Sequence, residues 1–329
     1  MSYVQLLAGL ALLLIGGDVF VRGAVSVAQR FNVSPLLIGL TLVGFGTSLP
    51  ELFASLEAAR IGSPGIAVGN VVGSNIANIL LILGLSALIT PLVTAPGSLR
   101  RDGPVLIATS ALTIGICLLG RIDRWWGLMF LGLLLTYMIH AYLSERRHHD
   151  ERAQLHLAEV AEVKPLATTP VLMLVITLGG LIGIIFGAGL LVDSAVVLAQ
   201  AFGLSEAVIG LTIVAVGTSL PELTTSLIAA IRRHGDVALG NVVGSNVFNL
   251  LGILGATALF RPIPVPIEIA HFDNWIMLAA TALFVFFATT RLRVERWEGG
   301  ILLAGYLGYI STLLAPSLAR ALELVLPAS

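Results

Sequence analysis

Apolar residues fill long stretches of this chain, and short polar or proline-containing segments separate them. A membrane-spanning helix needs roughly 20 consecutive, mostly apolar residues. Stretches of about that length recur along the sequence, and we expect each to form a transmembrane helix. They are residues 3–29, 35–59, 66–90, 103–120, 125–143, 168–200, 206–231, 237–260, 274–291 and 298–316. The pattern predicts an all-α polytopic membrane protein with ten transmembrane helices.

Two blocks of sequence occur twice. GLTLVGFGTSLPEL at 39–52 returns as GLTIVAVGTSLPEL at 210–223, and AVGNVVGSNIANIL at 67–80 returns as ALGNVVGSNVFNLL at 238–251. Both pairs are 171 residues apart, which indicates an internal duplication. Each copy holds five predicted helices, so the second copy enters the membrane from the opposite side. Such inverted-topology repeats occur in many secondary transporters.

A charged segment separates the two repeats. We expect a first repeat at 1–143, a cytoplasmic loop at 144–166, and a second repeat with a short C-terminal tail at 167–329. The N-terminal apolar stretch lacks a basic region before it, so we interpret it as a first span and not as a signal peptide. If both termini lie outside, 12 of the 18 Lys and Arg residues face inward and five face outward. This imbalance predicts both termini outside.

Composition adds two limits. Only 11% of the residues are charged, against ~25% in soluble domains, which agrees with a membrane protein. The single cysteine, Cys117, excludes a disulfide framework and a cysteine-rich metal site. His148, His149 and His156 lie in the loop region, where solvated side chains are a simpler interpretation than a metal site. Tyr137 is expected at a membrane interface.

Polar oxygens interrupt the first repeated block. In a helix, Thr47 and Glu51 lie one turn apart with Ser48 beside them. Pro50 has no N–H, and its ring presses on the carbonyl four residues back, so the helix should kink or unwind there. Freed carbonyls and buried carboxylates are how discontinuous membrane helices bind cations. The second repeat holds the same set at Thr218, Ser219, Pro221 and Glu222.

The second block carries an amide and hydroxyl stripe. Asn70, Ser74 and Asn78 are spaced four apart, and their equivalents are Asn241, Ser245 and Asn249. Oxygen-only ligands suit hard cations such as Na⁺ and Ca²⁺ and disfavour zinc or copper. For four other residues we favour packing or backbone roles, as is usual for small residues in membrane helices: Gly69, Gly73, Asn75 and Asn246.

GTSLPE followed by GNVVGSN, present twice, resembles the alpha repeats of the cation/calcium exchanger superfamily and especially its prokaryotic sodium/calcium exchangers. The resemblance implies a ten-helix integral protein of a prokaryotic inner membrane that exchanges three Na⁺ for one Ca²⁺. The implied cation ligands are Thr47, Ser48, Glu51, Ser74, Asn78, Thr218, Ser219, Glu222, Ser245 and Asn249, with backbone carbonyls near Gly44 and Ala215. Some prokaryotic relatives and the K⁺-dependent branch have Asp where this chain has Asn249, so we expect K⁺-independent exchange.

Other functions remain open at this point. A Ca²⁺/H⁺ antiporter could use the same scaffold, a cation channel would need an open pore, and an intramembrane enzyme lacks a recognisable motif. We expect a non-enzymatic antiporter without cofactors or nucleic-acid partners, functional as a monomer in the lipid bilayer.

Glu57 is either a vestibule carboxylate or a solvated helix end. Asp18 and Arg22 suggest a local ion pair. Asp193 either pairs with Arg22 or faces water near the end of its helix.

Overall fold

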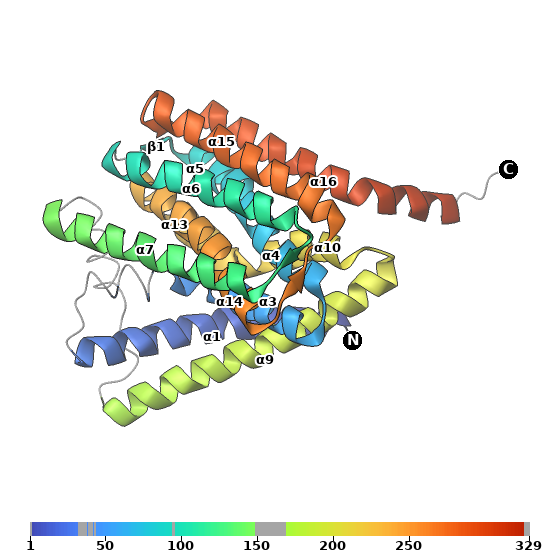
Figure 1. The fold of residues 1–329 in the computed structure, drawn as a ribbon, viewed down its shortest axis with the longest axis horizontal. Helices are drawn as coiled ribbons and strands as arrows, with labels where there is room; N and C mark the ends of the chain where they lie inside the picture. Colours follow the sequence, from blue (N-terminus) through green and yellow to red (C-terminus); the bar gives the residue numbers. More distant parts are fainter. Residues whose placement is uncertain are drawn as a thin grey trace.

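A computed structural model describes residues 2–31, 38, 42, 44–93, 96–148 and 169–325 (Figure 1). Its first half contains α1 (Ser2–Arg30), η2 (Gly46–Ser48), α3 (Leu49–Ile61), α4 (Pro64–Ile76), η3 (Ala77–Leu83), α5 (Gly84–Ile89), β1 (Leu92–Val93), α6 (Pro96–Cys117), β2 (Arg121–Ile122) and α7 (Arg124–His148). The described part is therefore mostly helical, as predicted. The predicted 144–166 loop overlaps the end of α7, and residues 149–168 lie outside the described ones.

The second half repeats this order. It contains α9 (Pro170–Phe202), α10 (Glu206–Ile209), η4 (Gly210–Val214), α11 (Ala215–Thr218), α12 (Leu220–Ile231), α13 (Gly235–Val247), η5 (Phe248–Ile253), α14 (Leu254–Phe260), β3 (Ile263–Pro264), η6 (Ile269–Asp273), α15 (Asn274–Thr290), β4 (Arg293–Val294) and α16 (Arg296–Val325). Pro64–Ile76 and Gly235–Val247 coincide residue for residue under the offset read from the sequence. The duplication therefore extends to the helix boundaries.

Seven helices are long and apolar enough to cross a membrane, and an eighth span is added if the bent pair Glu206–Thr218 and Leu220–Ile231 counts as one. The count of ten expected from the sequence is not reached among the described residues. The second expected span, 35–59, lies partly outside them. The fourth, 103–120, lies mostly in α6, which ends at Cys117, carries the charged residues Arg100, Arg101 and Asp102 near its start, and is not among the seven.

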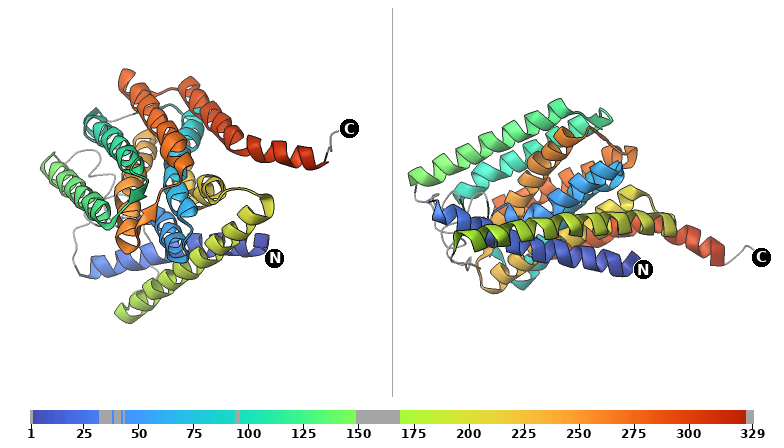
Figure 2. Two further views of the ribbon diagram at one scale, coloured as in Figure 1. Left: turned by 45° about the vertical axis from the view of Figure 1, so that its right-hand side comes forward. Right: turned by 90° about the horizontal axis from the view of Figure 1, so that it is seen from below.

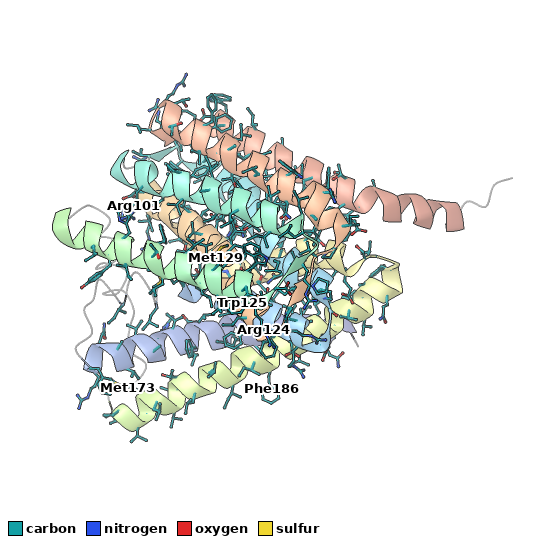
Figure 3. All side chains as sticks on the ribbon, viewed as in Figure 1. Arg101, Arg124, Trp125, Met129, Met173 and Phe186 are labelled. Atoms are coloured by element: carbon teal, nitrogen blue, oxygen red, sulfur yellow. The ribbon has the colours of Figure 1, made fainter. Side chains whose placement is uncertain are left out.

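The repeated blocks form the centre of the bundle. In the spans Pro64–Ile89 and Gly235–Phe260, 78% of the most apolar window is buried, against 22% in α1 and α9. The outer helices instead expose large apolar side chains, such as Phe186 on the outer side of α9 (Figure 3). Apolar exposure of this kind fits contact with lipid, whereas the largely buried spans carry the amide and hydroxyl residues of the second motif block.

Helices α1 and α9 pack side by side along one face of the bundle (Figures 1 and 2). Glycines make this close approach possible. A Cβ on Gly16 would lie 2.8 Å from the backbone nitrogen of Ile184, and one on Gly187 would lie 2.7 Å from that of Leu13. Gly16 and Gly187 are equivalent positions in the two repeats. The seam between α1 and α9 is therefore a small-residue contact in which both repeats take the same part.

Two short antiparallel strand pairs connect the halves. β1 pairs with β4, with Leu92 opposite Val294, and β2 pairs with β3, with Ile122 opposite Ile263. Each pair takes one strand from either repeat. At the level of the whole bundle, α1 begins and α16 ends at one end, whereas α7 ends and α9 begins at the other (Figure 1).

Candidate functional site

Each repeat breaks its helix directly before the motif glutamate. In the first repeat, the 3₁₀ turn Gly46–Ser48 precedes α3, in which Pro50 occupies the first turn. In the second, α11 and α12 meet at a bend of 50°. The sequence prediction of a proline-dependent break is confirmed in both. Glu51 and Glu222 thus lie in the first turns of α3 and α12, where the helix dipole favours negative charge.

The two glutamates are fully buried and are bonded across the repeats. The Ser48 hydroxyl donates to Glu222 Oε1 at 2.7 Å, and the Ser219 hydroxyl donates to Glu51 Oε1 at 2.9 Å. Ser48 and Ser219 are equivalent positions, as are Glu51 and Glu222, so each bond is the counterpart of the other with the repeats interchanged. This pattern corresponds to an approximate two-fold axis between the repeats. The other carboxylate oxygen of each glutamate, Oε2, has no partner among the described residues. Buried oxygens without partners are costly, and a bound cation would satisfy both.

The amide stripe reaches the same centre. The Ser245 hydroxyl lies 3.5 Å from Glu222 Oε1, and the Ser74 hydroxyl lies 3.4 Å from the Ala215 carbonyl oxygen. That carbonyl is one of the two expected from the resemblance. Gly44 lies in the turn before η2, and its proposed role stays a prediction.

Asn78 and Asn249 lie in π-helical turns, η3 and η5, which begin at equivalent positions. Single π turns inside α-helices are frequent at functional sites, and the sequence pattern gave no indication of them. Asn78 Nδ2 donates to Asn246 Oδ1 at 2.9 Å. The Oδ1 atom of Asn78 is buried and has no partner among the described residues. Both side-chain polar atoms of Asn249 are likewise buried and unpartnered there.

Asn70 and Asn241 hold the broken helices in place. Asn70 Nδ2 donates to the Glu51 carbonyl at 3.0 Å and to Ser55 Oγ at 2.9 Å. Asn241 Nδ2 repeats these bonds with the Glu222 carbonyl at 3.4 Å and Ser226 Oγ at 3.1 Å. Sequence reasoning missed the two serines, although Ser55 and Ser226 are equivalent positions under the 171-residue offset.

The residues expected to have packing or backbone roles behave mostly in that way. A Cβ on Gly73 would lie 2.6 Å from the Leu211 carbonyl, so this glycine permits close approach of α4 to η4. Asn75 donates to the Val71 carbonyl at 2.7 Å. Asn246 approaches the Asn75 carbonyl at 3.4 Å, but it also accepts from Asn78. This second contact, which orients an expected ligand, was missed.

The two motif threonines differ. Thr218 donates to Asn70 Oδ1 at 3.1 Å and to the Val214 carbonyl at 3.0 Å. The Thr47 hydroxyl is buried beside the Glu222 carboxylate but has no hydrogen-bond partner among the described residues. Thr47 instead lines a cavity of about 370 Å³ that also touches Asp18, Pro221 and Thr224. The two threonines therefore occupy equivalent sequence positions but differ in their hydrogen bonds.

Charged residues outside the centre form local pairs. Arg22 Nε contacts Asp18 Oδ1 at 2.9 Å, which confirms the expected local ion pair. Glu57 is paired with Arg60 through both carboxylate oxygens, at 2.6 and 2.7 Å, and this pair does not decide between a vestibule carboxylate and a solvated helix end. Between these described residues, Arg22 is paired with Asp18 and not with Asp193.

The interfacial interpretation of Tyr137 was incomplete. Its hydroxyl donates to the buried Asp102 at 3.2 Å, and in the second repeat Tyr309, one position beyond the 171-residue offset, donates to Asp273 at 2.8 Å. An aromatic–carboxylate pair therefore recurs in both repeats. His149 and His156 lie outside the described residues, as does the side chain of His148.

The possible cation ligands of the centre are oxygen atoms, from two carboxylates, hydroxyls, side-chain amides and backbone carbonyls. In the described ranges no three His, Cys, Asp or Glu residues gather as a metal-binding group of the zinc type. Such an arrangement fits reversible binding of hard cations.

Comparison with known proteins agrees with this chemistry. A family model described as "Sodium/calcium exchanger protein" matches residues 1–143 and 172–315. The sodium/calcium exchanger MaX1 of Methanosarcina acetivorans is 32% identical over 346 aligned residues, which cover 95% of this chain and 98% of that protein. The inner membrane protein YrbG of Escherichia coli is 35% identical, with 91% and 92% covered.

A solved structure of the sodium-calcium exchanger NCX_Mj, soaked with Na⁺ and Sr²⁺, is also similar. It matches with a TM-score of 0.61 at 35% identity, covering 94% of this chain and 97% of that chain. Family model, relatives and structure agree over nearly the whole length of the chain. The chain belongs to the sodium/calcium exchanger protein family, and it is a membrane antiporter for cations including Ca²⁺ rather than an enzyme.

Proposed function

We propose that this chain exchanges Na⁺ for Ca²⁺ by alternating access, electrogenically and without K⁺. The reciprocal Ser48–Glu222 and Ser219–Glu51 bonds carry the proposal. They bring one carboxylate from each repeat to a single buried centre and leave one oxygen of each for a cation. The proposed ligands are Thr47, Ser48, Glu51, Ser74, Asn78, Thr218, Ser219, Glu222, Ser245 and Asn249, with the carbonyls near Gly44 and Ala215.

Charge balance explains why the two ions exclude each other. Ionised Glu51 and Glu222 supply two negative charges, and the amides of Asn78 and Asn249 supply none. One Ca²⁺ or two Na⁺ neutralise that pair. At an effective dielectric of 20, unit charges ~4 Å apart interact by about 4 kcal/mol. A site loaded with one ion type therefore strongly disfavours addition of the other.

Electrogenicity follows from stoichiometry. Exchange of three Na⁺ for one Ca²⁺, as the family resemblance implies, leaves the sodium-loaded form with one more positive charge. Transport should then respond to membrane potential. Asn249 adds no third carboxylate that would attract K⁺, which supports K⁺ independence. Proton coupling is the second candidate, because the same two carboxylates could carry H⁺.

The architecture we propose is ten helices in two inverted repeats, acting as a monomer, with both termini outside a prokaryotic inner membrane. The common end of α1 and α16 supports termini on the same side (Figure 1). Single cysteines at Ser144→Cys and Ser329→Cys, in a Cys117→Ala background, test the orientation. Labelling of Ser144→Cys by an impermeant reagent from outside intact cells would contradict it.

Purified protein in liposomes tests the coupling. Ca²⁺ uptake should follow an outward Na⁺ gradient, accelerate when the potential is clamped inside-positive, and persist when choline replaces K⁺. An absolute K⁺ requirement would contradict the interpretation of Asn249. Uptake that ignores Na⁺ and follows a pH gradient would move the chain to the Ca²⁺/H⁺ alternative.

A further inference from the structure

The cavity beside Thr47 connects the proposed cation centre with a charged residue that the centre does not use. Its walls come from α1, η2, the start of α3 and α12, and include Asp18, Thr47, Pro50 and Thr224. The Thr47 hydroxyl is buried, whereas the Asp18 side chain is 55% exposed. Thr47 therefore marks the inner end of the cavity and Asp18 its open end.

Asp18 occupies an unusual place for a charged residue. It lies 16 residues into α1, roughly 24 Å along a helix that is apolar enough to span a membrane. Charged residues at such depth generally face a water-filled path or another charge, because exposure to lipid is costly. Its partner Arg22 is 39% exposed, and in a water-filled path an exposed ion pair of this kind is weak. A cation arriving from water can thus compete with Arg22 for the Asp18 carboxylate.

The second repeat does not copy this arrangement. The residue equivalent to Asp18 is Gly189, and the residue equivalent to Arg22 is Asp193. A Cβ on Gly189 would lie 3.9 Å from Glu57 Oε1, so a carboxylate from α3 fills the corresponding space. That carboxylate is only 13% exposed and is bound by Arg60 through both oxygens. An exposed and weakly paired carboxylate therefore occurs at Asp18 in the first repeat and has no counterpart at the equivalent position of the second repeat.

We propose that Asp18 is a cation-binding residue on the access path, which receives the ion before it reaches Glu51 and Glu222 and serves one face of the membrane only. Arg22 limits how long the ion stays, because it competes for the same oxygens. This inference rests on the proposed exchange function. It adds a binding residue outside the repeated motifs, and it makes the two faces of a duplicated protein unequal in their affinity for cations.

Membrane vesicles of both orientations test this. Na⁺-loaded right-side-out and inside-out vesicles are assayed for Ca²⁺ uptake against external Ca²⁺ concentration. Asp18→Asn should raise the half-saturating Ca²⁺ concentration roughly three- to tenfold in one orientation only, and added choline chloride should reduce the difference. Asp18→Glu should restore the wild-type value, and Arg22→Gln should lower it. Asp193→Asn, an exposed carboxylate outside the cavity lining, is the matched control and should leave it unchanged.

An equal shift in both orientations, or none, would overturn the proposal for Asp18. Absence of Na⁺-driven uptake by the wild-type chain would contradict the exchange function instead. A labelling measurement then tests Asp18 without transport. In a Cys117→Ala background, Thr224→Cys should react faster with a cationic than with an anionic thiol reagent. Asp18→Asn should reduce that rate ratio roughly three- to tenfold; an unchanged ratio would refute the role of Asp18.

Discussion

Replacing one central glutamate by glutamine should abolish Ca²⁺ transport without unfolding the protein. Glu51 is fully buried, accepts from Ser219 through Oε1, and holds Oε2 without a described partner. In Glu51→Gln the amide oxygen can still accept from Ser219, so the contact between repeats persists. The change removes the charge and little else. The same reasoning applies to Glu222→Gln, in which Ser48 is the conserved donor.

The size of the loss follows from the charge removed. A unit charge ~4 Å from another contributes about 4 kcal/mol at an effective dielectric of 20, and a divalent ion doubles this to about 8 kcal/mol. The glutamine oxygen remains a neutral ligand and recovers part of that energy. We take about 4 kcal/mol as the net loss, which corresponds to roughly a thousandfold weaker Ca²⁺ binding. Stability in the absence of cations should be equal or higher, because no charge must be buried.

Two assays separate binding from folding. Thermal unfolding of purified protein should show Ca²⁺-dependent stabilisation for the wild type, since a ligand at 100 times its Kd adds about 2.7 kcal/mol. Glu51→Gln should lose this stabilisation and all Na⁺-driven uptake. Glu298→Gln is the matched control: Glu298 is also buried, but its Oε2 accepts from the Glu295 N–H far from the motifs in the sequence. Uptake by Glu51→Gln within tenfold of wild type would refute the site.

Further predictions concern positioning, packing and pH. Asn246→Ala removes the acceptor that orients Asn78, so the half-saturating Ca²⁺ concentration should rise roughly three- to tenfold in uptake assays, in line with ~1 kcal/mol for one hydrogen bond. Gly16→Ala should lower the thermal unfolding temperature through overpacking of ~1–3 kcal/mol against α9, whereas Gly115→Ala, with open space around it, should not. Acidic pH should inhibit Ca²⁺ uptake competitively, because protons neutralise the carboxylates of Glu51 and Glu222; inhibition unaffected by Ca²⁺ concentration would contradict this.

Local chemistry was largely readable from the sequence. The proline rule placed the helix breaks before Glu51 and Glu222, and the structure has them there. The constant offset also predicted that equivalent residues would make equivalent contacts, as Asn70 and Asn241 do. These features depend on a few neighbouring residues or on the duplication itself, so a single sequence is enough to find them.

Features that depend on packing between distant segments could not be read in this way. Nothing in the motif GTSLPE specifies that Ser48 bonds the glutamate of the other repeat, 174 residues away. The π-helical turns at Asn78 and Asn249 have no hydropathy signal, because their residues are as apolar as those of an ordinary membrane helix. Tyr137 was assigned from its place near a helix end, whereas its hydroxyl contacts Asp102 on a neighbouring helix.

The differences between the repeats bear most directly on mechanism. Thr218 is bonded to Asn70, and Asn78 is bonded to Asn246, yet Thr47 and Asn249 have no side-chain partners among the described residues. Because the residues are duplicated, a second state with these bonds exchanged would contain the same kinds of interaction and would differ little in free energy. Two states of similar free energy are what a transporter needs, since ion binding can then shift the population by its differential affinity alone. In the proposed alternating-access exchange, duplication of the motif would supply two states of similar free energy, and the few unduplicated residues, Asp18 and Glu57 among them, would distinguish one face of the membrane from the other.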